Sequence, residues 1–147
     1  MPSEAQWEFA ARGQKNLRYP WGDEAPDATR ACFGQQKPTP VGRYPAGRGP
    51  FGTLDQAGNV WEWCKDRWEP GAYKTEVHQG PRLDPVIETG NVWVHGARGG
   101  SFLEIQPEST AWLAASFRSW GWGNDGYDRC GFRVVVVGAA AHAAAHR

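Results

Sequence analysis

The sequence lacks any excess of charge. Lysine plus arginine and aspartate plus glutamate both number 16 among the 147 residues, so the formal net charge is zero. No block of like charge stands out along the chain either. Because binding to a phosphate backbone depends on clustered lysine and arginine, this balance argues against non-specific nucleic-acid binding, and we expect no nucleic-acid partner.

A long apolar run is also lacking. The longest, Val134 to Val137, has the length of a strand and not of a transmembrane helix, so we expect no membrane insertion. The start, Met1 to Glu4, is polar and unlike a signal peptide. It leads abruptly into a predicted helix, which favours a longer natural chain with upstream residues, so this N-terminus assigns no compartment.

Cysteine is scarce and odd in number. Cys32, Cys64 and Cys130 have no spacing typical of a metal site. At most one disulfide can form, and a fully reduced chain fits the sequence equally well. We therefore expect neither a cysteine metal centre nor a disulfide framework.

Tryptophan and glycine are abundant instead, with nine and 19 residues. Tryptophan buries a large area and carries a polar N–H, and glycine permits turns and close backbone approaches. The length suits one domain with a real core. This composition predicts a loop-rich domain of short strands and excludes a helical bundle.

One short helix is predicted near the N-terminus. Ser3 can cap it, and Gln6 can reach back to complete a capping box. Trp7, Ala10 and Ala11 recur on one face, and Gly13 supplies the stop, which gives a helix of about ten residues. Residues 19–50 are punctuated by proline and glycine and predict ordered loop.

Several short strands are predicted after this loop. Gly58-Asn59 marks a turn, and residues 60–64 alternate as in a half-buried strand. Residues 93–95 and 98–102 predict a second and a third strand, whereas residues 112–118 fit either a helical turn or a strand. The clearest strand covers residues 131–137, and its β-branched run indicates a central position in the sheet.

The last nine residues, 139–147, form a low-complexity tail with no apolar face to pack. His142 and His146 are spaced i, i+4, so on a helix they could share a metal ion. A disordered, dispensable tail is the favoured interpretation.

Six segments together resemble one family. The motifs of the formylglycine-generating-enzyme, or sulfatase-modifying-factor, domain family are similar to residues 2–13, 19–22, 41–45, 51–64, 98–102 and 131–134. The resemblance implies an α+β, C-type lectin-like fold over residues 1–138, loop-rich with short strands and few helices. It begins partway into the usual domain, so we expect an N-terminally truncated one.

The resemblance also places the catalytic positions. The copper-dependent oxidases of this family use two cysteines shortly after the Arg-Gly-Gly-Ser motif, because thiolates bind Cu(I). Glu104 and Ser109 occupy those positions here, and Cys130 lies too far along the chain. His78 and His95 are isolated. We therefore expect no copper and no enzyme activity, although a non-cysteine oxidoreductase remains an alternative.

A structural calcium ion is a further implication of the resemblance. The ligands would be the carboxylates of Asp55 and Glu62 and the carbonyls of Gly58 and Val60, which are the hard oxygens that Ca²⁺ prefers. In the alternative interpretation, Asp55 caps a turn and Glu62 pairs with an arginine such as Arg98.

A binding face is predicted between the last two motifs, in residues 103–130. This segment mixes aromatic and small polar residues as antibody paratopes do. It resembles the diversified segment of variable proteins from diversity-generating retroelements, which display a binding surface to a protein or other macromolecular ligand. The candidate contact residues are Glu104, Ile105, Ser109, Trp112, Ser119, Trp120, Gly121, Trp122, Asp125, Tyr127, Asp128, Arg129 and Cys130.

The tryptophans of the other motifs are assigned to the core. Trp7, Trp21, Trp61 and Trp63 each bury enough area to favour this role over ligand contact. The leading hypothesis is thus a non-catalytic ligand-binding domain. The alternatives are an oxidoreductase of the formylglycine-generating type and a regulatory or structural domain of a larger protein.

Overall fold

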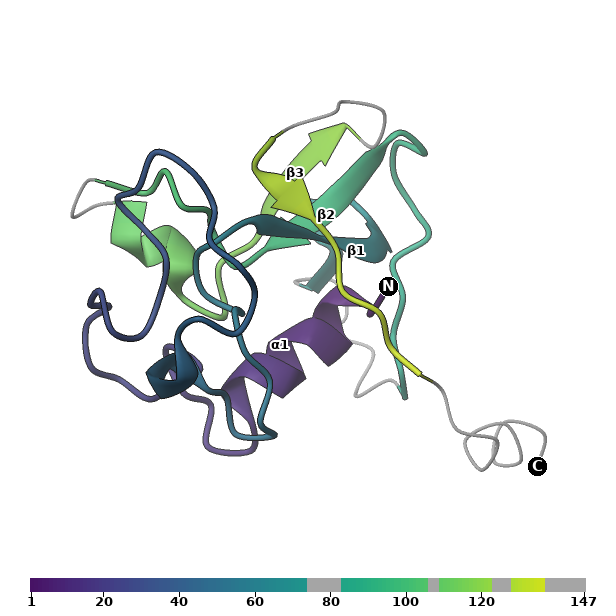
Figure 1. The fold of residues 1–147 in the computed structure, drawn as a ribbon. Helices are drawn as coiled ribbons and strands as arrows, with labels where there is room; N and C mark the ends of the chain where they lie inside the picture. Colours follow the sequence, from purple (N-terminus) through teal and green to yellow (C-terminus); the bar gives the residue numbers. More distant parts are fainter. Residues whose placement is uncertain (74–82, 106–108, 123–127, 137–147) are drawn as a thin grey trace.

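The computed structural model describes residues 1–73, 83–105, 109–122 and 128–136. In these ranges, helix α1, two short 3-10 helices and four strands are joined by long loops (Figure 1). This arrangement confirms the α+β, loop-rich class with short strands and few helices. The elements are α1 (Glu4–Arg12), η1 (Pro45–Gly47), β1 (Trp61–Arg67), β2 (Val94–Arg98), η2 (Ser109–Leu113), β3 (Ser119–Trp122) and β4 (Cys130–Gly131).

Helix α1 begins and ends as predicted. The Ser3 side chain accepts a hydrogen bond from the Gln6 N–H, and the Gln6 side chain accepts one from the Ser3 N–H. The capping box is therefore complete. Gly13 ends the helix at a positive φ of 58° and donates its N–H to the Phe9 carbonyl. Trp7 faces the core at 1% exposure.

The strands form one sheet in the order β3-β2-β1-β4. Strand β2 is antiparallel to both β1 and β3, and β4 is parallel to β1. The predicted strand at 60–64 is confirmed and extends to Arg67. The two strands predicted at 93–95 and 98–102 are instead one, β2, which ends where Gly99 and Gly100 adopt positive φ. The ambiguous segment 112–118 begins with a helical turn, η2.

The prediction of a central last strand is wrong. Strand β4 is two residues long and lies at the sheet edge, where it pairs with β1 alone. The following residues do not fill the core: Phe132, Val134 and Val136 are 65%, 76% and 91% exposed. Their β-branched composition favours extended backbone, but it carries no information on whether other elements cover the segment. Residues from 137 onward, including the tail, lie outside the described part.

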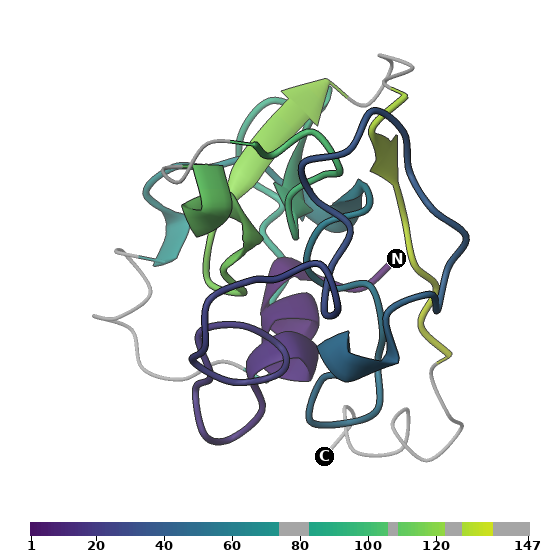
Figure 2. The ribbon, with the colours of Figure 1, turned by 60° about the vertical axis from the view of Figure 1, so that its left-hand side comes forward.

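The core lies between α1 and one face of the sheet. Trp7 and Ala11 of the helix pack against Cys64 of β1 and Ala115, and α1 contacts both β1 and β2. The loops between α1 and β1 wrap around the helix (Figure 2). Cys32, Cys64 and Cys130 are all free thiols. No helix in the described ranges is long and apolar enough to cross a membrane.

Candidate functional site

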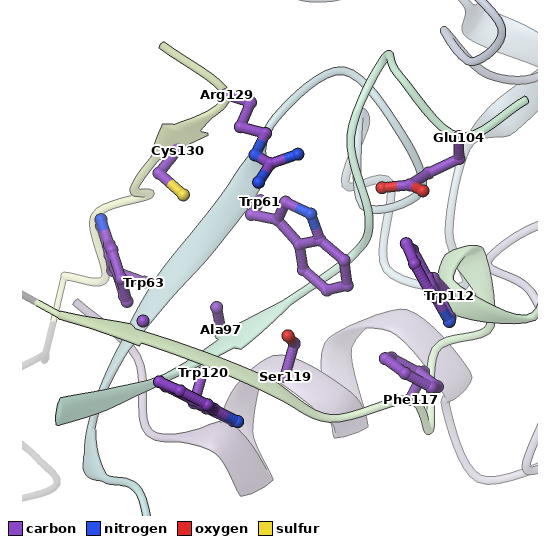
Figure 3. Close-up of a pocket in the computed structure, with 11 residues that line it drawn as sticks. Trp61, Trp63, Ala97, Glu104, Trp112, Phe117, Ser119, Trp120, Arg129 and Cys130 are labelled. Carbon is purple, nitrogen blue, oxygen red and sulfur yellow. The ribbon is translucent and has the colours of Figure 1, made fainter. Parts of the chain in front are cut away.

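A pocket of about 350 Å³ opens on the sheet face opposite α1 (Figure 3). Its described walls come from all four strands, the η2 turn and three loop segments. Five of the described lining side chains are aromatic, and one is a carboxylate. The lining residues are Trp61, Trp63, Ala97, Glu104, Trp112, Phe117, Ser119, Trp120, Gly121, Arg129 and Cys130.

The floor of the pocket is formed by side chains of β1, which point alternately to the two faces of the sheet. Glu62 and Cys64 point toward α1, where the Trp7 indole N–H donates to Glu62 at 2.5 Å. The intervening Trp61 and Trp63 therefore point to the opposite face, into the pocket. Trp63 lies against the backbone of Gly121 on β3, because a Cβ built on that glycine would be 2.5 Å from the indole. Gly121 thus makes room for the Trp63 ring.

Two aromatic rings line the pocket from η2 and the turn that follows it. The centroid of the Phe117 ring lies 6.2 Å from those of both Trp61 and Trp112. The position of this turn is fixed from beneath the sheet by Arg98. Its Nη1 donates to the carbonyls of Ala115 and Phe117 at 3.1 and 3.3 Å.

Arg98 belongs to a buried ionic network against α1. Its side chain is fully buried, and Nε and Nη2 donate to the carboxylates of Glu4 and Glu8, each at 2.9 Å. Arg118 donates to both oxygens of the same Glu4 at 2.7 and 2.8 Å. Because Glu4 is fully buried, both arginines compensate its charge. The network ties the 115–118 turn to the helix.

Glu104 is the buried carboxylate of the pocket. It is 4% exposed, and its Oε1 accepts hydrogen bonds from the Ser101 N–H and hydroxyl at 3.3 and 3.1 Å. Burial raises its pKa above the usual value, while the bonds from Ser101, the charge of Arg129 and the Trp61 side chain lower it. Figure 3 shows the carboxylate directed toward the indoles of Trp61 and Trp112. A ligand in the pocket would therefore meet an ionisable group.

Cys130 also lines the pocket, from the β4 edge. Burial raises the pKa of its thiol, and the neighbouring Arg129 lowers it. It lies on the far side of Trp61 from Glu104 in Figure 3. The two groups therefore stand at separate ends of the pocket.

The structure brings together seven of the predicted contact residues, namely Glu104, Trp112, Ser119, Trp120, Gly121, Arg129 and Cys130. Ile105 and Asp128 are exposed and are not among the described lining residues. Ser109 lies in η2 and Trp122 in β3, but their side chains lie outside the described part, as do Asp125 and Tyr127 entirely.

Sequence reasoning missed four lining residues, Trp61, Trp63, Ala97 and Phe117. The assignment of the motif tryptophans to the core is right for Trp7 but incomplete for Trp61, which is 8% exposed and still faces the pocket. It is wrong for Trp63, which is only partly buried. The strand alternation at 60–64 placed both indoles on one face and was the signal that could have found them.

The four predicted calcium ligands lie around the turn before β1. Asp55 accepts a hydrogen bond from the Gly42 N–H at 2.7 Å. Both Glu62 oxygens accept from Arg133, which takes the place suggested for Arg98. Within the described ranges no three His, Cys, Asp or Glu side chains form a metal cluster. An ion would have to compete with Arg133 for Glu62, so the calcium site stays a prediction.

Comparison with known proteins gives the family. Residues 1–137 match the model of the sulfatase-modifying factor enzyme 1-like domain. The chain is 40% identical over 118 residues to a formylglycine-generating enzyme from Thermomonospora curvata, covering 70% of this chain and 38% of that one. It is 36% identical over 131 residues to a hercynine oxygenase from Mycolicibacterium thermoresistibile, covering 82% and 28%. The chain thus spans well under half of each relative.

These relatives contradict the expectation that the chain is not an enzyme, because proteins 36–40% identical to it carry the names of two enzymes. The physical error lies in the inference from two side chains. Glutamate and serine at positions 104 and 109 cannot supply thiolates, but a pocket with a buried carboxylate can support other chemistry. The absence of copper is untested and stays a prediction.

Solved structures confirm the fold. PvdO from Pseudomonas aeruginosa superposes with a TM-score of 0.70 and 26% identity, covering 90% of this chain and 50% of that one. Treponema denticola variable protein 1 superposes with a TM-score of 0.60 and 23% identity, covering 90% and 45%. Both likenesses support the C-type lectin-like fold of the formylglycine-generating type. With the family model matched over residues 1–137, this chain belongs to the sulfatase-modifying factor enzyme 1-like family.

Proposed function

We propose that the aromatic pocket is the site where this domain binds its ligand, a protein or another macromolecule. The rings of Trp112 and Trp120 are 43% and 53% exposed, and apolar surface gathered around a pocket is typical of a binding site. Sequence and structure support the same segment, because residues 103–130 were expected to form the binding face and supply most of the described lining.

The observation that carries the proposal is the burial of Glu104 within these aromatic walls. A carboxylate that is 4% exposed costs free energy when ionised unless it has partners, and burial raises its pKa accordingly. Perturbed ionisable groups in concave sites are typical of functional residues. Because relatives of the chain are enzymes, we propose that Glu104 exchanges a proton with the bound ligand.

A selection with random peptides tests the pocket as a binding site. Peptides displayed on phage are selected on the full chain and then assayed on Trp112→Leu and on Trp93→Leu. Trp93 is also exposed, at 62%, and is not among the lining residues. We expect the selected peptides to lose at least tenfold in affinity on Trp112→Leu and to bind Trp93→Leu normally. Equal binding to both variants contradicts the proposal.

A second, finer candidate is that residues 103–130 are a diversified segment, as in variable proteins of diversity-generating retroelements. The observation in its favour is that eight of the eleven described lining residues come from this one segment, whereas Trp61 and Trp63 come from β1 and Ala97 from β2. Diversification then changes the ligand without changing β1 and β2. The test is the gene neighbourhood: a reverse transcriptase gene beside a near-copy of the codons for residues 103–133, differing at adenines, supports this candidate. A neighbourhood without such a copy removes it.

A further inference from the structure

The described lining of the pocket combines aromatic faces with one buried carboxylate, that of Glu104. Trp61, Trp112 and Phe117 surround the end at which Glu104 lies, and Trp63 and Trp120 line the other end (Figure 3). Aromatic faces attract cations through the ring quadrupole, more strongly where water is excluded. We propose, on the basis of the binding site proposed above, that the pocket receives the alkylammonium side chain of a lysine from a protein ligand, with Glu104 as its counter-ion.

The depth of the charge favours a cation on a long stem. Glu104 is 4% exposed, whereas Trp112 and Trp120, which also line the pocket, are about half exposed. A ligand must therefore pass apolar rings before it reaches the carboxylate. The four-carbon stem of lysine packs along apolar surface while its ammonium group extends beyond it, and a volume of about 350 Å³ accommodates such a side chain.

Glu104 has capacity for a further donor. Both hydrogen bonds from Ser101 go to Oε1, and the Trp61 side chain is a third donor to the carboxylate. A carboxylate has about four acceptor positions, so one remains for a ligand, and the carboxylate is directed into the pocket. Ser119, half-buried in the wall, adds a hydroxyl on the β3 side of the pocket, away from Glu104 (Figure 3). The Glu104 oxygens can accept from an ammonium group that leaves water, and a buried charge requires such a partner.

The positive charge of Arg129 repels a cation in the pocket. Glu104, Arg129 and Cys130 are the titratable groups among the described lining residues. Arg129 is exposed, so water and salt screen its charge, whereas the attraction between Glu104 and the ligand acts where burial strengthens it. Removing the Arg129 charge should therefore increase the affinity for a cation.

The test uses a pair of probes, one with and one without the ammonium group at the end of the side chain. Nα-acetyl-lysine N-methylamide and its norleucine analogue are titrated into the full chain, and the indole N–H signals of the pocket tryptophans are followed by NMR. We expect the lysine probe to bind at least tenfold more tightly. Glu104→Gln should abolish this preference, and Arg129→Ala should raise the lysine affinity.

The pH dependence of probe affinity tests the same proposal on the wild-type chain, without any variant. Glu104 carries the one carboxylate among the described lining residues, so lysine affinity should fall as pH decreases through a pKa above the usual 4.5, while norleucine affinity stays constant. Equal binding of both probes overturns the lysine proposal and leaves the binding site intact. Binding of neither probe also overturns it, and the peptide selection then decides separately on the site.

Discussion

At the scale of single residues, the turn before β1 joins three segments of the chain. Gly58 and Asn59 both have positive φ, at 77° and 65°. The Gly58 N–H donates to the Gly99 carbonyl, and the Asn59 N–H donates to the Cys32 carbonyl, each at 2.8 Å. The Asn59 carbonyl accepts from the Phe102 N–H at the same distance. The start of β1 therefore depends on Gly58, which has no side chain and can adopt this positive φ.

Gly58→Ala should destabilise the fold severely. A Cβ at this position would lie 2.3 Å from the Cys32 carbonyl oxygen, and the positive φ would be strained as well. We expect a loss of about 3 kcal/mol or more in the free energy of unfolding, measured by denaturant titration. Gly52→Ala is the control, because Gly52 also has a positive φ but nothing within 4 Å. Its loss should be about 1 kcal/mol, and equal losses would contradict the steric explanation.

At the scale of elements, local signals and long-range ones differ in what they predict. The capping box and Gly13 lie within or beside α1, so the helix could be placed from its own residues. The position of residues 131–137 in the sheet depends on what packs beside them, and β4 proved to be a two-residue edge strand. Strand composition alone does not determine that neighbour.

The residues of the pocket also divide into those that sequence signals predict and those whose position depends on packing. Glu104 was predicted because it stands at a known motif position, and Trp120 because of the composition of its segment. Trp61 and Trp63 could be placed on one face of β1, but the sequence did not determine which face packs against α1. Only the contact between Trp7 and Glu62 assigns the opposite face to the pocket.

Arg98→Met should be far more destabilising than Arg12→Met. Both arginines contact Glu8, but Arg98 is fully buried and also binds Glu4 and two carbonyls of the 115–118 turn. Losing it leaves buried oxygens without partners, so we expect a cost of about 3–5 kcal/mol in the free energy of unfolding. Arg12, partly exposed, should cost about 1 kcal/mol or less. Thermal and denaturant unfolding check the difference, and similar costs would refute the assigned role.

At the scale of the whole molecule, a calcium ion would affect the contact between β1 and the segment after β4. Glu62, one of the predicted ligands, is bound by Arg133 in the segment after β4. Calcium and Arg133 therefore compete for one carboxylate. An ion that binds here would rearrange the contact between β1 and the residues that follow β4.

Chelation tests the calcium prediction. Adding EDTA should lower the melting temperature of the full chain, because an ion bound to the folded state stabilises it. Asp55→Ala should abolish this response, whereas Asp84→Ala, at an exposed aspartate outside the site, should preserve it. If EDTA leaves the melting curve of the wild-type chain unchanged, the calcium prediction is wrong.

The hold of Arg98 on the 115–118 turn has a consequence for protein engineering. Arg98 grips the turn through the carbonyls of Ala115 and Phe117, and every amino acid carries a carbonyl. These two hydrogen bonds therefore do not depend on the side chain at position 117, which faces the pocket. Residues 117, 119 and 120 can be randomised in a library while the hydrogen bonds of Arg98 stay constant. Ligand binding can then be varied separately from folding.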